Sequence, residues 1–242
     1  MTNFVYINGY KTFFKQKGKG QNLLLLHGWG GNNDSFGPFF DSMANFFCVT
    51  SFDFWGFGKS DKPPQNADTF WYAKMTVDFL SAIGVTKTHV VSHSFGGRVA
   101  MVVASQNKNL FDKVVLCASA GIKPKFSLKK YIRTKRYKRA KKRGKNLDGF
   151  GSDDYKNLTP DMQKVFVRVV NDFLENHAKK VTSPTLLVWG KKDKTTPYYM
   201  AKKLNRLITN SGLVTMDGAG HFCFLEDFFT FDVVTKSFLG VL

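Results

Sequence analysis

Short apolar runs alternate along this chain with longer segments in which apolar residues recur at helical spacing. The short runs predict strands, and Asn8-Gly9 predicts the turn of an opening hairpin. The expected strands are residues 4–7, 12–17, 22–26, 47–52, 89–94, 113–119, 184–189 and 212–216. The expected helices are residues 34–45, 68–83, 99–105 and 225–239, with others that begin near 159 and end near 207. In the helix at 68–83, one buried face is expected from Phe70, Ala73, Val77, Leu80 and Ala82 or Ile83.

Alternating strands and helices favour an α/β fold, in which a mostly parallel sheet has helices on both faces. We expect an eight-stranded sheet of this kind from residues 1–121 and 181–242. The alternation stops after Gly121 and resumes near Pro184. Residues 122–180 are therefore expected to form an inserted helical cap.

The composition is that of a folded domain. With 242 residues, 43% hydrophobic and 15% aromatic, the chain has enough apolar material for one α/β unit with an insertion. No apolar run approaches the length of a membrane span, and residues 1–10 lack a secretory signal, so a cytoplasmic protein is expected. Cys48, Cys117 and Cys223 are scattered singly, without the spacing of metal ligands, and are expected to be reduced core residues.

The formal charge of +18 is concentrated in one segment. Thirteen Lys or Arg residues and no acidic residue lie between Lys123 and Lys145. The first interpretation is a solvated face of the cap. Two functional alternatives are attraction of an anionic substrate to the mouth of a site and contact with anionic lipid head groups. No nucleic-acid recognition motif accompanies the charge, so nucleic-acid binding is not expected.

Ser94 is the candidate nucleophile. It follows an apolar, β-rich run and precedes Gly96-Gly97, which opens a helical segment. A strand, a sharp turn and a helix form a nucleophile elbow, where small residues let the helix leave close to neighbouring strands. Ser92 stands where the usual G-x-S-x-G pattern has its first glycine. Taken alone, the same serine could be a simple helix N-cap.

Other polar groups follow other predicted strands. His27-Gly28-Trp29-Gly30-Gly31 is a glycine-rich turn whose free backbone N–H groups suit an oxyanion hole. Asp193 and His221 follow later strands, and the carboxyl ends of parallel strands meet at one edge of a sheet. Serine, aspartate and histidine, in this chain order, supply a nucleophile, an orienting acid and a base.

Alternatives remain open at these positions. His27 and His93 are rival histidines near the same edge, and Asp193 could instead pair with its lysine neighbours Lys191, Lys192 and Lys194. The segment from Asp53 to Ser60 contains Gly-x-Gly and Gly-Lys-Ser. It lacks both the third glycine of a dinucleotide loop and the Walker spacing, so a tight structural turn is expected there.

Together these motifs resemble the α/β-hydrolase superfamily, in its capped, esterase-like and haloperoxidase-like form. The matching motifs are His27-Gly28, Asp53-x-x-Gly56-x-Gly58-x-Ser60, the serine elbow, Asp193 and Gly218-x-Gly220-His221. The resemblance implies Ser94 as nucleophile, His221 as base and Asp193 as orienting acid. It also implies an oxyanion hole formed by the backbone N–H groups of Trp29 and Phe95. This sequence departs from the family pattern at Ser92 and at Trp55, where proline is common.

Aromatic residues are the candidates for substrate contact. We expect Trp29, Phe95 and Phe222 to contact the substrate. Phe39, Phe126, Phe150, Phe166 and Phe224 could line an apolar acyl pocket as well, although core packing is the expected role of most of them.

The sequence therefore predicts a carboxylesterase-like serine hydrolase that cleaves an ester or related acyl bond of a small molecule through an acyl-enzyme. No metal or organic cofactor is expected. The resemblance also allows carbon-carbon bond hydrolysis, lyase chemistry or acyl transfer by the same groups. A non-catalytic ligand-binding or membrane-surface protein of the same fold is a further alternative. Serine in the elbow argues against the dehalogenase and epoxide-hydrolase branches, which the resemblance associates with aspartate.

Overall fold

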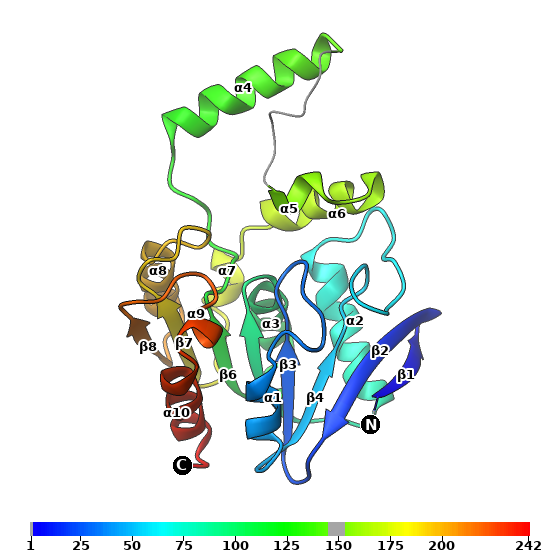
Figure 1. The fold of residues 1–242 in the computed structure, drawn as a ribbon, viewed down its shortest axis with the longest axis vertical. Helices are drawn as coiled ribbons and strands as arrows, with labels where there is room; N and C mark the ends of the chain where they lie inside the picture. Colours follow the sequence, from blue (N-terminus) through cyan, green and yellow to red (C-terminus); the bar gives the residue numbers. More distant parts are fainter. Residues whose placement is uncertain (1, 145–152) are drawn as a thin grey trace.

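The computed structural model describes residues 2–144 and 153–242. Within this part of the chain, eight strands form one sheet in the order β1-β2-β4-β3-β5-β6-β7-β8 (Figure 1). The strands are β1 (Thr2–Ile7), β2 (Tyr10–Lys17), β3 (Asn22–Leu26), β4 (Cys48–Phe52), β5 (Thr88–His93), β6 (Phe111–Cys117), β7 (Thr185–Gly190) and β8 (Ser211–Met216). The helices are α1 (Pro38–Met43), α2 (Thr69–Ala82), α3 (Phe95–Gln106), α4 (Leu128–Lys142), α5 (Asp153–Lys156), α6 (Pro160–Asn171), α7 (Glu175–Ala178), α8 (Tyr199–Leu207), α9 (Cys223–Glu226) and α10 (Phe228–Leu239).

The sheet is mostly parallel and is covered on both faces. Within the described chain, β2 runs opposite to the other strands and pairs antiparallel with β1 and β4; β4, β3, β5, β6, β7 and β8 pair in parallel. Leu23 and Leu25 of β3 pack in one core with residues of α1, α9 and α10, while Leu24 and Leu26 pack in the other with residues of α2, α3 and α8. A strand buried on both faces reads as an unbroken apolar run. The expected eight-stranded α/β sheet is confirmed.

Two helices differ from the expected ranges for local reasons. Helix α1 begins at Pro38 rather than near residue 34, because Gly37 has φ 40° and the proline occupies the first turn. The expected helix at 225–239 is interrupted, since α9 ends at Glu226 and Asp227 then caps α10. The Asp227 carboxylate accepts the Thr230 N–H at 3.3 Å.

The predicted buried face of α2 is confirmed except at Phe70. Ala73 and Leu80 are buried, and Val77 and Ile83 are partly buried and pack against the same core. Phe70 is 39% exposed, and of the alternatives Ala82 and Ile83 it is Ala82 that is exposed. The helix packs against both α3 and β1, which extends its buried face to Thr69, Tyr72, Met75, Thr76 and Phe79. Thr76 can occupy this face because its hydroxyl donates to the Tyr72 carbonyl at 2.8 Å.

The segment between β6 and β7 carries α4, α5, α6 and α7. Figure 1 shows α5 and α6 over the sheet and α4 farther from it. Helix α6 joins the core through Met162, Val165 and Val169, and α7 packs against α3 and α8. The boundaries predicted for a separate cap, residues 122–180, remain a prediction. No described helix combines the length and the apolarity needed to cross a bilayer.

The three cysteines are free, as expected, but two of them are not isolated. Cys117 and Cys223 are both buried, and their Sγ atoms lie 3.3 Å apart although 106 positions separate them in sequence. Burial, together with the neighbouring thiol, raises the pKa of Cys117 well above its ordinary value. Such a thiol is protonated at neutral pH and is a poor nucleophile.

The first turn of α3 allows no side chain at Gly96. A Cβ built there would lie 2.3 Å from the Leu26 carbonyl oxygen, a backbone atom that cannot rotate away. A Cβ at Gly212, in the edge strand β8, would meet nothing within 4 Å. We expect Gly96→Ala to lower the free energy of unfolding by about 1–3 kcal/mol or more, and Gly212→Ala to leave it within about 1 kcal/mol. Urea unfolding of both variants tests this, and equal stabilities would contradict the close approach of α3 to β3.

Candidate active site

Ser94 lies in the sharp turn between β5 and α3. Its backbone has φ 49° and ψ −104°, in the left-handed region that non-glycine residues rarely adopt. Backbone hydrogen bonds hold it there. The Ser94 N–H donates to the Cys117 carbonyl at 3.1 Å, and its own carbonyl accepts the N–H groups of Gly97 and Ala120 at 3.1 and 3.0 Å. This strained turn places the serine at the carboxyl end of the sheet.

The departure at Ser92 is accommodated within the sheet. Ser92 is fully buried, and its hydroxyl donates to the Val115 carbonyl of the neighbouring strand β6 at 3.0 Å. A buried hydroxyl with a partner avoids the cost of an unsatisfied polar group. A small side chain therefore replaces the usual glycine without disturbing the elbow.

Three side chains from distant parts of the chain form one line of hydrogen bonds. His221 Nε2 lies 3.1 Å from Ser94 Oγ, and His221 Nδ1 lies 2.8 Å from Asp193 Oδ2. The carboxylate can only accept, so Nδ1 carries the proton and the Nε2 lone pair faces the serine hydroxyl. The structure thus brings Ser94, Asp193 and His221 together from the ends of β5, β7 and β8.

Asp193 is held by its own loop rather than by lysines. Its Oδ1 accepts the N–H groups of Thr195 and Thr196 at 2.8 and 2.9 Å, and its Oδ2 accepts the Thr196 hydroxyl at 2.7 Å. Lys191 pairs instead with Asp217 at 3.2 Å. Burial would raise the pKa of Asp193, but the hydrogen bond and charge of His221, together with Thr196, outweigh it and hold that pKa below its ordinary value. The group is therefore a carboxylate at neutral pH.

The two rival histidines are engaged with the backbone. The Nδ1–H of His27 donates to the Gly28 carbonyl at 2.7 Å, and its Nε2 accepts the Phe54 N–H at 3.0 Å. His93 Nε2 donates to the His221 carbonyl at 3.0 Å. Burial lowers the pKa of His27 to about 4, and burial with the nearby His221 lowers that of His93 to about 3. Both imidazoles are neutral supports of the surrounding loops.

The backbone N–H groups of Trp29 and Phe95 lie on two adjoining turns. The turns are linked by the Gly96 N–H, which donates to the His27 carbonyl at 3.1 Å. Neither the Trp29 nor the Phe95 N–H donates to another group among the hydrogen bonds of the described residues. The first of these turns needs a glycine at position 28, since a Cβ at Gly28 would lie 2.7 Å from His93 Nδ1. Free donors on fixed turns are what an oxyanion hole requires.

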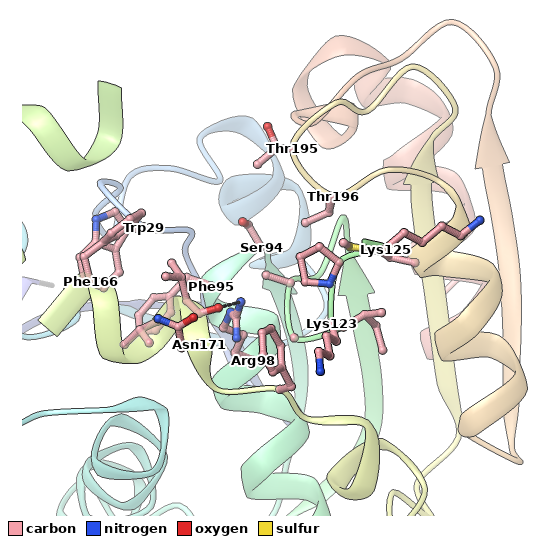
Figure 2. Close-up of a pocket in the computed structure, with 18 of the residues that line it drawn as sticks. Trp29, Ser94, Phe95, Arg98, Lys123, Lys125, Phe166, Asn171, Thr195 and Thr196 are labelled. Carbon is pink, nitrogen blue, oxygen red and sulfur yellow. Dashed lines mark hydrogen bonds between the residues drawn. The ribbon is translucent and has the colours of Figure 1, made fainter. Parts of the chain in front are cut away.

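A cavity of about 510 Å³ opens beside Ser94 (Figure 2). Its lining includes the candidate contact residues Trp29 and Phe95, as well as Phe126 and Phe166 from the segment between β6 and β7. Phe222 does not line this cavity; its ring is 51% exposed and packs 5.4 Å from that of His221.

The remaining aromatic candidates are distributed differently. Phe39 and Phe224 belong to the core beneath the sheet and do not reach the cavity. Phe150 lies outside the described residues. Core packing therefore accounts for these two residues, in line with the expectation for most of the phenylalanines.

Two functional candidates were not found from the sequence. Thr196, which holds the Asp193 carboxylate, gives no signal in a loop of polar residues. Arg98 lines the cavity and was detectable, because it is the only charged residue in the otherwise small and apolar helix α3. Among the residues described, no three His, Cys, Asp or Glu side chains form a group that could hold a metal ion. Whether the reaction needs a cofactor stays a prediction.

Burial of neutral His93 has a measurable consequence for acid stability. The unfolded chain protonates this residue near its ordinary pKa of 6.5, whereas the folded chain does so only near about 3. Between these values the unfolded state binds more protons, so stability falls as pH falls. We expect His93 to contribute about 1.4 kcal/mol per pH unit below about pH 6. The free energy of unfolding, measured with urea between neutral pH and about pH 4, should fall less steeply with decreasing pH in His93→Gln than in wild type. The difference in slope is expected whatever the stability of the variant at neutral pH, and equal slopes would contradict it.

Comparison with known proteins agrees with this architecture. The hydrolase of 2-hydroxy-6-oxo-6-(2'-aminophenyl)hexa-2,4-dienoic acid from Metapseudomonas resinovorans is 28% identical over 261 residues, covering 98% of this chain and 90% of the relative. Lipase 3 of Moraxella sp. strain TA144 is 27% identical over 234 residues, covering 86% and 73%. A solved serine hydrolase involved in carbazole degradation has 27% identity and a TM-score of 0.78, with 100% and 99% of the two chains covered.

More distant structures share the fold alone. The bromoperoxidase of Bacillus anthracis has 18% identity and a TM-score of 0.81, over 99% of this chain and 100% of that one. A family model described as the alpha/beta hydrolase family matches residues 23–230. The resemblance seen in the motifs is confirmed, and the chain belongs to the alpha/beta hydrolase family.

Proposed function

We propose that this protein is a serine hydrolase that cleaves an ester or related acyl bond of a small molecule. The observation that carries the proposal is the line of hydrogen bonds from Asp193 through His221 to Ser94, at 2.8 and 3.1 Å. A non-catalytic binding protein of this fold would have no use for a base aimed at a strained serine. The cavity beside Ser94 gives a small molecule access to it.

In the proposed mechanism, His221 Nε2 takes the hydroxyl proton as Ser94 Oγ attacks the carbonyl carbon of the substrate. The N–H groups of Trp29 and Phe95 bind the developing oxyanion, and one such donor is typically worth about 3 kcal/mol of transition-state stabilisation. His221 then passes the proton to the leaving alcohol, which leaves an acyl group on Ser94. Water, deprotonated by His221, releases the acid and restores the serine. Asp193 keeps Nδ1 protonated and stabilises the imidazolium.

The relatives support hydrolysis but leave the bond open. One is named a lipase and another a hydrolase of a dienoic acid. The same nucleophile, base and oxyanion donors would serve ester hydrolysis, carbon-carbon bond hydrolysis, lyase chemistry or acyl transfer. An ester is proposed first because it needs nothing beyond these groups and water. A cytoplasmic location remains a prediction.

The triad is tested by labelling and substitution. A fluorophosphonate should label Ser94, and Ser94→Ala should abolish the adduct and lower kcat/KM on 4-nitrophenyl esters by roughly four to six orders of magnitude. Asp193→Asn should lower kcat by about 10,000-fold because the wrong His221 tautomer then forms. Ser81→Ala, at an exposed position of α2, is the matched control and should behave as wild type. The proposal would be refuted if the fluorophosphonate labelled Ser94→Ala, or if wild type neither reacted with the fluorophosphonate nor cleaved 4-nitrophenyl esters.

A second candidate role concerns the basic segment. Leu128, Tyr131 and Ile132 are exposed at the start of α4, and Phe126 is exposed just before it; Phe126 and Tyr131 also line the cavity. The neighbouring Arg136 is also exposed. Apolar side chains beside an uninterrupted positive charge are typical of surfaces that bind anionic lipid. We therefore propose that α4 can dock on an anionic bilayer, which would bring the cavity mouth close to lipid substrates.

Vesicle sedimentation separates this role from that of a solvated face. Wild type should bind phosphatidylglycerol vesicles more strongly than phosphatidylcholine vesicles, and added salt should weaken the binding. The double variant Arg136→Glu/Arg139→Glu should lose most of it. Lys202→Glu/Arg206→Glu, in α8, makes the same charge change away from α4 and should retain it. Equal binding by the two double variants would contradict docking through α4.

A further inference from the structure

Arg98 is a buried cation in an unfavourable place. It is only 7% exposed and lies in the first turn of α3, whose remaining residues up to Ser105 are small or apolar. Burying a charge is costly, and the N-terminal end of a helix dipole repels a cation. Neither the packing of α3 nor the proposed triad explains why an arginine occupies this position.

Arg98 and Ser94 are close in the chain. Arg98 lies in the first turn of α3, four residues beyond Ser94, which occupies the N-cap with a non-helical backbone. Both line the same cavity, and Figure 2 shows Arg98 on the side of Phe95 and Asn171. A group bound at the guanidinium would therefore belong to the molecule whose carbonyl reaches Ser94.

The guanidinium has only neutral partners. Its Nη1 donates to the Asp172 carbonyl at 2.5 Å and its Nη2 to the Val170 carbonyl at 3.5 Å. Among the described residues, no carboxylate lies within ion-pair distance of Arg98; the Asp172 carboxylate accepts the Thr69 N–H, and Glu175 pairs with Lys203 at 3.0 Å. Burial lowers the pKa of Arg98 to about 10, although the charges of Asp172 and Glu175 favour the protonated form, so the charge of Arg98 persists at neutral pH.

The rest of the cavity adds positive charge and nothing to neutralise it. Lys123 and Lys125 also line it, and both are exposed. No aspartate or glutamate occurs among the described lining residues. The carboxylates that favour the charged form of Arg98 do not line the cavity, so a bound anion would be the first negative charge that the guanidinium meets there. A desolvated guanidinium is a multiple hydrogen-bond donor that favours carboxylates.

We propose that Arg98 binds a carboxylate carried by the substrate, so that the substrate class is an acyl compound with a second, anionic group that reaches the guanidinium when its carbonyl lies at Ser94. This rests on the proposed function, because Ser94 is taken as the reacting group. The exposed Lys123 and Lys125 would draw such an anion to the cavity mouth.

The competing explanation is a structural clamp. The carbonyls of Val170 and Asp172 belong to the end of α6, so Arg98 also ties α6 to α3. If this were its whole role, removing the guanidinium would harm charged and neutral substrates equally. The test therefore compares matched pairs of substrates rather than activity alone.

Two substrate pairs cover the two places where the charge can sit. The first is mono-4-nitrophenyl adipate and its neutral primary amide, with the charge on the acyl part. The second is O-acetyl 4-hydroxyphenylacetate and its amide, with the charge on the leaving group. In at least one pair, wild type should have a higher kcat/KM for the anionic substrate than for its neutral amide. Arg98→Gln should lower the ratio of these two kcat/KM values roughly 10- to 100-fold. Arg98→Lys should keep part of the preference, because it retains the charge but not the fork.

The matched control is Arg168→Gln. Arg168 is exposed on α6 and does not line the cavity, so its loss makes the same charge change nearby without touching the site. It should leave both ratios unchanged. Loss of the preference in both arginine variants, or equal loss on the anion and its amide in Arg98→Gln, would overturn the carboxylate site while leaving the proposed hydrolase intact.

A binding measurement separates this inference from the proposed function. In the Ser94→Ala background, titration calorimetry should show adipate binding more tightly than adipamide, and addition of Arg98→Gln should remove the difference. This result would support the site even if every ester tested were left uncleaved. Equal affinity for adipate and adipamide, with no anion preference in either substrate pair, would refute it.

Discussion

The arrangement of this molecule depends on how closely backbones approach one another at the carboxyl ends of the central strands. The Gly96 N–H donates to the His27 carbonyl, the Ser94 N–H to the Cys117 carbonyl, and the Ala118 N–H to the Val188 carbonyl, all between 3.0 and 3.1 Å. These bonds join β3, β5, β6 and β7 just where each strand gives way to a loop. They hold Ser94 in its strained conformation. The nearby N–H groups of Trp29 and Phe95 have no acceptor among the described residues. Strain at a functional position persists only where the surroundings over-determine it, as these bonds do.

Electrostatics within this edge follow from differences in solvation. Burial disfavours the charged ring of His27 and His93, whereas the donors around Asp193 favour its ionised form. His221 sits between the two environments, with its ring 14% exposed. Three histidines lie within a few residues of this edge, and of these it is His221 whose ring nitrogens contact both Ser94 and Asp193. Environment, rather than residue type, distinguishes the proposed base from its neighbours.

The sequence was a good guide wherever one local rule controls the structure. The unbroken run Asn22–Leu26 became β3, and Ser94, Asp193 and His221 were found because parallel strands bring their ends together. It failed where contacts are non-local. The extent of the buried face of α2 is set by packing on two elements at once, and the proximity of Cys117 to Cys223 follows from topology alone. Thr196 and Phe222 show the same limit at the site, since loop geometry decides which side chains face the carboxylate or the cavity.

The edge position of β8 means that the candidate site and the core of the fold need not have the same stability. This strand is the edge of the sheet, hydrogen-bonded to β7 alone, and most of its residues are partly exposed. The loop that follows it carries the imidazole, while the serine is embedded in the interior between β5 and α3. Fraying costs least at such an edge. An opening confined to this margin would separate His221 from Ser94 while the interior stays assembled. Loss of the proposed activity would then precede unfolding of the core.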